Sequence, residues 1–204
     1  MVFPNDAAVT AFQSSAATST EKVGGVSITL QAPAMKGLQS AIAEASQSGK
    51  TITPRGADAA KRSYAGTVEL WASRVNPGLD HYLGLGRIAA GDAARIRGLS
   101  PYEQVPEIFK LESQGMYFSK DLSKSIIYSV APPGSSQHLS MLALDVTENE
   151  NSDVRKILAK HGWFQTVLSD LPHFTFLGVP ESELPSLGLK KSSSGGRVFW
   201  TPDI

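Results

Sequence analysis

The chain has 204 residues, a hydrophobic content of 41%, and 19 acidic against 19 basic side chains, so its formal net charge is zero. This length allows one well-buried core and is short for two full domains. The balanced charge argues against general nucleic-acid binding and against attraction to an acidic membrane surface. No apolar run approaches the roughly 20 residues that a membrane-spanning helix needs. The absence of cysteine excludes a thiol nucleophile, a disulfide scaffold and a thiolate-held structural zinc.

The N-terminal half reads as a mixture of strands and helices. Few large apolar residues occur in residues 1–25, so we expect a loosely ordered segment there and a single domain over residues 26–204. Local patterns then predict a strand, a helix stopped by glycine and a second strand, over Val26–Leu30, Met35–Ser46 and Thr51–Pro54. A longer helix follows Asp58, and we expect Asn76-Pro77-Gly78 to end it. Its apolar stripe is more typical of a core than of a substrate groove and consists of Tyr64, Val68, Trp71 and Val75.

The C-terminal half continues the mixture. Short helices are predicted over Ala90–Ile96, Tyr102–Leu111 and Asp153–His161, the last capped by Gly162. Strands are predicted over Ser125–Val130 and, after a Pro/Ser/Gly-rich tail at 180–195, over Arg197–Trp200. The fold class is therefore α+β, with a small, mostly antiparallel sheet flanked by helices.

Two further predicted strands carry polar residues suited to binding a metal ion. In Leu142–Val146 the leucines and the valine share one face, while Ala143 and Asp145 share the other. In His173–Phe176 the aromatic residues share a face and the histidine lies opposite. If the two strands belong to one sheet, Asp145 and His173 therefore occupy the same open face. His138 precedes Asp145 by an odd offset, so the backbone must turn between them, over 139–141.

Two imidazoles and one carboxylate form the ligand set of an open catalytic zinc site, in which the fourth position is left for water. Asp170, three residues before His173, is placed to act as the proton-transfer group. The alternative is a metal-free domain, since a lone His138 or His173 is more often a hydrogen-bonded core residue. The remaining histidines, His81 and His161, are expected to be surface or packing residues.

These segments resemble the zinc D,D-peptidase family, which includes vancomycin-resistance-type D-Ala-D-Ala dipeptidases and carboxypeptidases and phage endolysins that cut L-Ala-D-Glu bonds. The family motif S-x-H-x-x-G-x-A-x-D is matched by Ser136, His138, Ala143 and Asp145, with Met141 at the glycine position. The motif E-x-x-H before a hydrophobic strand is matched by His173, with Asp170 at the glutamate position. Upstream, Arg62-Ser63-Tyr64 is similar to the R-S-Y helix start that supplies a substrate-polarising arginine, and Arg55 is a competing candidate for that role.

The resemblance implies a zinc D,D-peptidase/hedgehog-like fold and a zinc-dependent, D,D-carboxypeptidase-like enzyme that hydrolyses peptidoglycan stem peptides containing D-amino acids. It assigns Zn²⁺ to His138, Asp145 and His173. It also assigns catalysis to Asp170 with Arg62 or Arg55, and substrate binding to Ser136. The alternative is a non-catalytic or weakly active module of the same fold that binds metal and a cell-wall component or partner. A wall substrate implies a periplasmic or secreted protein whose signal has been removed.

Overall fold

The computed structural model describes residues 1–203, and the chain folds into two compact units. The first unit combines Met1–Phe12 with Ser63–Leu139. The second combines Gln13–Arg62 with the chain from Ser140 on. The prediction of a single domain over residues 26–204 stays a prediction.

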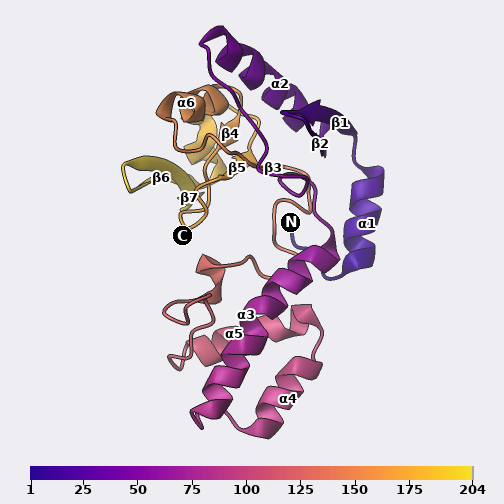
Figure 1. Ribbon diagram of the computed structural model, residues 1–204, viewed down its shortest axis with the longest axis vertical. Coiled ribbons are helices and arrows are strands. Elements are labelled where there is room, and N and C mark those ends of the chain that lie inside the picture. The colour runs from indigo at the N-terminus through magenta and orange to yellow at the C-terminus, as the bar shows by residue number, and fades with distance from the viewer. Residues whose placement is uncertain (204) are drawn as a thin grey trace. The chain divides into compact units, whose positions relative to one another are not determined.

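The first unit is helical (Figure 1). Its helices are α1 (Asp6–Ser15, which ends beyond the unit), α3 (Tyr64–Gly84), α4 (Ala90–Gly98), α5 (Pro101–Glu112) and the short 3₁₀ helix η1 (Ile126–Tyr128). Helices α3, α4 and α5 pack together around a core that contains Trp71 and Val75, both without exposed surface. The Trp71 indole donates a hydrogen bond to the Gln104 side chain (3.1 Å), so its polar atom is satisfied inside the core. The predicted apolar stripe is therefore core.

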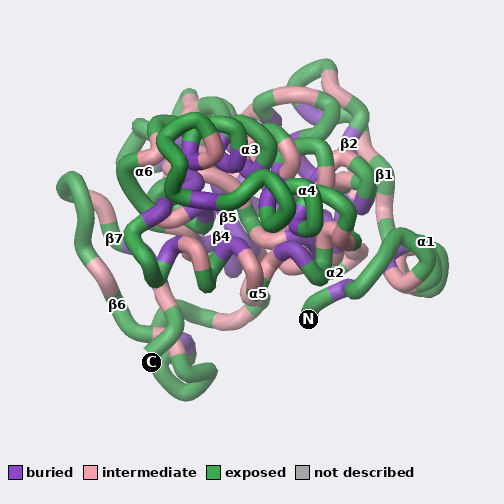
Figure 2. Tube along the Cα trace, turned by 90° about the horizontal axis from the view of Figure 1, so that it is seen from below, coloured by how far each residue is buried: buried purple, intermediate pink, exposed green. Residues whose placement is uncertain are grey.

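The second unit contains the sheets. An antiparallel hairpin of β1 (Thr18–Val23) and β2 (Val26–Gln31) leads into α2 (Ala32–Gln47). A three-stranded antiparallel sheet has the order β3-β5-β4, from Ala143–Asp145, His173–Phe176 and Trp163–Phe164, and α6 (Ser152–Lys160) precedes β4. The 3₁₀ helix η2 (Glu181–Leu187) leads to a second hairpin, formed by β6 (Leu189–Ser194) and β7 (Arg197–Pro202). Most residues of β6 are exposed (Figure 2). These small antiparallel sheets with helices confirm the predicted α+β class.

A large core runs through the second unit, and a smaller cluster forms around Phe164, Leu184 and Trp200. The large core joins apolar residues of β2, α2, α6, β3 and β5, among them Leu30, Leu38, Leu144 and Phe174. Leu144 lies on the predicted inward face of β3 and has no exposed surface. Among the described residues, no helix is both long enough and apolar enough to cross a membrane.

Three element predictions differ from the structure. Helix α3 does not end at Asn76–Gly78 and continues through Pro77 to Gly84. Ser125–Val130 is not a strand, because the Glu112 carboxylate accepts the Ile126 backbone N–H (2.6 Å) and the segment winds into η1. Thr51–Pro54 forms only an isolated bridge, from Pro54 to Val146, because the Glu148 carboxylate takes the Thr53 backbone N–H (2.7 Å).

Residues 1–25, expected to be loosely ordered, contain α1 and β1. Strand β1 needs few apolar side chains because its backbone pairs with β2 along its whole length. Helix α1 buries only Val9, which joins a small cluster with Phe3, Tyr64 and Leu139.

Candidate metal centre

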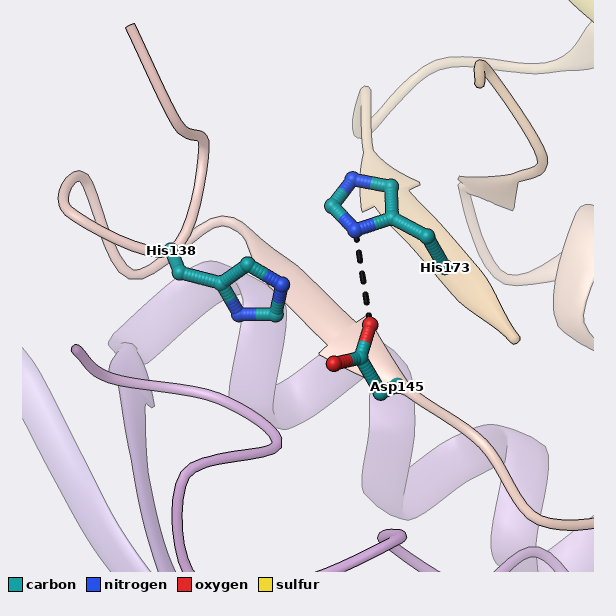
Figure 3. A group of neighbouring side chains, drawn as sticks. All are labelled: His138, Asp145 and His173. Atoms are coloured by element: carbon teal, nitrogen blue, oxygen red, sulfur yellow. Dashed lines mark ion pairs between the residues drawn. The ribbon is translucent and has the colours of Figure 1, made fainter. Parts of the chain in front are cut away.

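Strand pairing brings Asp145 and His173 together. Strands β3 and β5 are antiparallel, and their register places Asp145 directly opposite His173. One Asp145 carboxylate oxygen, Oδ1, lies 3.4 Å from His173 Nδ1 (Figure 3). The expectation that the two strands belong to one sheet, with these side chains on one face, is therefore confirmed.

A turn precedes β3 at the predicted place. Residues 137–141 form the turn, and Met141 has φ 57°, the left-handed conformation that favours glycine. The turn is anchored on the end of β2, because the Gln31 backbone N–H donates to the Met141 carbonyl (3.1 Å) and the Gln31 amide side chain donates to the Ser140 carbonyl (2.7 Å). A methionine therefore occupies a position whose backbone conformation favours glycine.

His138, Asp145 and His173 are a group that could hold a metal ion. Each offers a ligand atom, and these three atoms lie within 4.8 Å of one another. In Figure 3 both imidazoles point toward the carboxylate, His138 from a loop and His173 from β5. Both histidines are buried, with 2% and 4% of their surface exposed. Zn–N and Zn–O bonds of about 2.0–2.2 Å require only a small adjustment of these side chains, and the N/N/O donor set suits zinc.

Arg62 and a threonine pair surround these ligands. Arg62 Nη2 donates to the other Asp145 oxygen, Oδ2, at 2.6 Å, and Arg62 Nε donates to the Asp58 carbonyl (2.9 Å). His173 Nε2 lies 3.3 Å from Thr175 Oγ1, which shares a hydrogen bond with Thr166 Oγ1 (2.7 Å). Such contacts orient ligand side chains and set which ring nitrogen carries the proton.

The structure separates the two candidate arginines. Arg62 contacts the Asp145 carboxylate. It lies immediately before helix α3, whose N-terminus is capped by the Ser63 hydroxyl, so the predicted helix start is present. Arg55 instead lines a hollow of about 410 Å³ together with Asp170. The Arg55 backbone N–H donates to the Asp145 carbonyl (2.9 Å). This hydrogen bond fixes the Arg55 backbone, at the edge of the hollow, to the end of β3.

The functional roles of Asp170 and Ser136 stay predictions. Asp170 is exposed and does not belong to the three-residue metal group. Its backbone carbonyl accepts the His173 N–H (3.1 Å), which places it one turn ahead of β5. The Ser136 carbonyl accepts the Leu139 N–H (3.1 Å) and so closes the turn that carries His138.

The other two histidines lie elsewhere, as expected. His81 is exposed on α3, and His161 contacts Glu44 (2.9 Å). Lys160 and then His161 lower the pKa of the Glu44 carboxyl through their hydrogen bonds. The sequence gives no sign of the contacts of Gln31 and Thr166, because a polar residue at a strand end or in a loop carries no pattern that indicates its partner, whether 109 positions away as for Gln31 or nine as for Thr166.

Comparison with known proteins gives a distant structural likeness. No protein-family model matches the chain, and no curated protein matches it in sequence. The fold is similar to that of the vancomycin-resistance D,D-pentapeptidase VanY, solved as a mutant in complex with Zn(II), with 15% sequence identity over 78% of this chain and 79% of that one and a TM-score of 0.42. A likeness of this extent identifies neither a family nor a reaction. Any functional conclusion depends on the site itself.

Proposed function

We propose that the protein is a zinc-dependent peptidase that hydrolyses peptidoglycan stem peptides containing D-amino acids, in the manner of a D,D-carboxypeptidase. The observation that carries this proposal is the convergence of His138, Asp145 and His173, two of them paired across β3 and β5. These are the residues at which the sequence resembles the ligand positions of the zinc D,D-peptidases. A wall substrate makes export of the protein part of the proposal.

His138, Asp145 and His173 would hold the ion. When bound, Zn²⁺ supplies Lewis acidity and makes water acidic enough to react near neutral pH. Arg62 fixes the orientation of Asp145 through Oδ2 and leaves Oδ1 facing His173. Its charge also offsets part of the negative charge of that carboxylate.

Asp170 is the proposed proton-transfer group. Its carboxylate would take a proton from the attacking water and deliver it to the nitrogen of the leaving amine, as the carbonyl carbon gains an oxygen and loses the amine. Arg55, which lines the same hollow as Asp170, is the arginine available to a substrate carbonyl or carboxylate, since Arg62 is engaged with Asp145. Ser136 would bind the peptide backbone.

The exposure of Asp170 favours a second candidate, a metal-binding module without catalysis that binds a wall component or a partner. Aspartate is one methylene shorter than the glutamate of the motif. A misplacement of about 1 Å can cost about a hundredfold in rate. In this candidate the metal stabilises the fold and nothing is hydrolysed.

Elemental analysis of the purified protein, combined with mass spectrometry of digested peptidoglycan and D-Ala-terminated peptides, tests the proposal. We expect one zinc per chain and released D-amino acids or shortened stem peptides. Asp170→Ala should abolish turnover and keep the zinc, whereas His173→Ala should lose both. Asp92→Ala, an exposed acid on α4, is the matched control and should keep both. Stoichiometric zinc with intact substrates would establish the binding module, and a protein that takes up no zinc would overturn both candidates.

A further inference from the structure

The two ring nitrogens of His173 lie in different surroundings. Nδ1 is 3.4 Å from Asp145 Oδ1, and Nε2 is 3.3 Å from Thr175 Oγ1. Figure 3 shows the ring with one nitrogen turned toward the carboxylate and the other turned away from it. Nδ1 is therefore the nitrogen that faces the candidate metal group. Because a metal ion binds imidazole through a nitrogen lone pair, the proton of the neutral ring would have to be on Nε2.

Thr175 is placed to accept a hydrogen bond from that Nε2–H group. It lies two residues after His173 in β5, so both side chains are on one face of the strand. Strands β3 and β4 flank it through Ala143 and Phe164, and only 6% of its surface is exposed. A hydroxyl group has one hydrogen to donate and can also accept. If Thr175 accepts from His173, its own buried hydrogen therefore needs another acceptor.

Thr166 supplies this acceptor. Its Oγ1 lies 2.7 Å from Thr175 Oγ1, at a distance where either hydroxyl could donate. Thr166 follows β4 and is only half-buried, so solvent can take its hydrogen. The arrangement that satisfies every group runs in one direction. His173 Nε2–H donates to Thr175, and the Thr175 hydroxyl donates to Thr166.

The opposite direction would disfavour a metal ion. If Thr166 donated to Thr175, the Thr175 hydrogen would be available to the lone pair of His173 Nε2. The ring proton would then be on Nδ1 and would occupy the position that an ion needs. An acceptor at position 166 favours the first arrangement. Its loss favours the second, since Nδ1–H can donate to the facing Asp145 carboxylate.

We propose that Thr166 is a positioning residue of the candidate metal centre. By accepting the Thr175 hydrogen it keeps the His173 proton on Nε2 and leaves Nδ1 to bind Zn²⁺. Thr166 is not one of the three candidate ligands and acts through Thr175. This inference rests on the zinc site of the proposed function, but it does not depend on whether a peptide is hydrolysed. Loss of an outer partner of a metal-binding histidine typically weakens metal affinity by about 10–100-fold.

Zinc titration of the full chain against a chromophoric chelator tests this proposal. Thr166→Val removes the hydroxyl at nearly constant size, and we expect the Kd for zinc to rise about tenfold or more. Thr166→Ser keeps a hydroxyl and should restore most of the affinity. If the valine variant fails to fold, Thr166→Ala removes the same group with the same expectation. Thr201→Val is the matched control and should leave zinc binding unchanged, because Thr201 is also half-buried in the second unit and shares a hydroxyl–hydroxyl bond with Ser192 (2.8 Å).

Two further measurements separate positioning from a merely structural role. In a double-mutant cycle, Thr175→Val should weaken zinc binding, and adding Thr166→Val should cost little more, because Thr166 acts only through Thr175. Nitrogen-15 NMR of the imidazoles, in mildly alkaline buffer with a chelator, reports the tautomer of His173, whose signals are assigned by their absence from His173→Ala. We expect the proton on Nε2 in the original protein and a shift toward Nδ1 in Thr166→Val.

The outcomes distinguish this inference from the proposed function. Unchanged zinc affinity in Thr166→Val, additive losses in the double variant, or a proton on Nδ1 in the original protein would each overturn the inference and leave the peptidase proposal in place. Intact peptides together with the expected changes in zinc affinity would overturn the proposed hydrolysis and support the role of Thr166. A chain that takes up no zinc would overturn both.

Discussion

Asp145 makes a different contact with each of its two oxygens. Oδ2 accepts a hydrogen bond from Arg62, and Oδ1 faces His173. The Arg62–Asp145 pair is mostly buried, with 22% and 13% of the two side chains exposed. A carboxylate held in this way keeps its direction, which is what a metal ligand needs. Arg62 is therefore a positioning residue in the proposed site.

Met141 occupies a position where the backbone favours glycine and the surroundings favour a large apolar side chain. Its φ is 57° and its side chain has no exposed surface. The left-handed conformation costs a non-glycine residue about 1–2 kcal/mol. Burying a methionine contributes more, since Met→Ala substitutions in cores cost about 2–5 kcal/mol. The side chain therefore outweighs the strain.

We predict that Met141→Gly and Met141→Ala both lower the free energy of unfolding, and that the alanine variant is the worse by about 1 kcal/mol. Both lose the buried side chain, but only glycine relieves the strained φ. Urea unfolding of the metal-free protein measures both values. An alanine variant at least as stable as the glycine variant would show that the left-handed turn is absent in solution.

At the scale of elements, helix α3 continues through Pro77, which breaks the usual rule for proline inside a helix. The reason is packing in the first unit. A side chain at Gly78 would have its Cβ 2.4 Å from a ring carbon of Phe118, so the glycine makes room for that ring against the helix. Beyond the proline the stripe continues with Leu79 and Tyr82, both buried. Burial of these residues stabilises the second half of α3.

We predict that Gly78→Ala destabilises the protein by about 1–3 kcal/mol. Overpacking of a core costs this much, which exceeds the gain of about 1 kcal/mol from better helix propensity. Gly84→Ala in the same helix is the matched control, because a Cβ there meets nothing within 4 Å and the change should be neutral or stabilising. Thermal unfolding followed by circular dichroism compares the two. A stable Gly78→Ala variant would contradict the close Phe118 contact.

Elements with a strong local pattern could be predicted from the sequence. The period of two in the strands that became β3 and β5 placed Asp145 and His173 on one face, and their register confirms it. Long-range side-chain contacts could not be predicted, because they carry no local signal. Arg62 and Asp145 are 83 positions apart. The Glu112 carboxylate that accepts the Ile126 N–H, and so keeps Ser125–Val130 from forming a strand, likewise leaves no trace in the hydrophobic pattern of that segment.

For the whole molecule, a metal ion bound at the proposed site would link function to stability. A ligand that binds only the folded chain stabilises it by about 2.7 kcal/mol when its concentration is a hundred times Kd. The candidate ligands lie far apart in the sequence, and two of them are on strands of the second unit's central sheet. Binding of one ion therefore requires β3 and β5 to be paired, and metal removal is expected to weaken that pairing.

We predict that a chelator lowers the Tm of the zinc-loaded protein by roughly 5–12 °C, which is the shift for about 3 kcal/mol in a chain of this size. The physical reason is mass action, since the unfolded chain does not preserve the three-residue site. His173→Ala should start from the lower Tm and show no response to chelator, whereas the exposed His81→Ala should respond like the original protein. Scanning calorimetry with and without added zinc measures all three. A chelator response that persists in His173→Ala would place the ion elsewhere in the molecule, and the proposed peptidase site would then lose its metal.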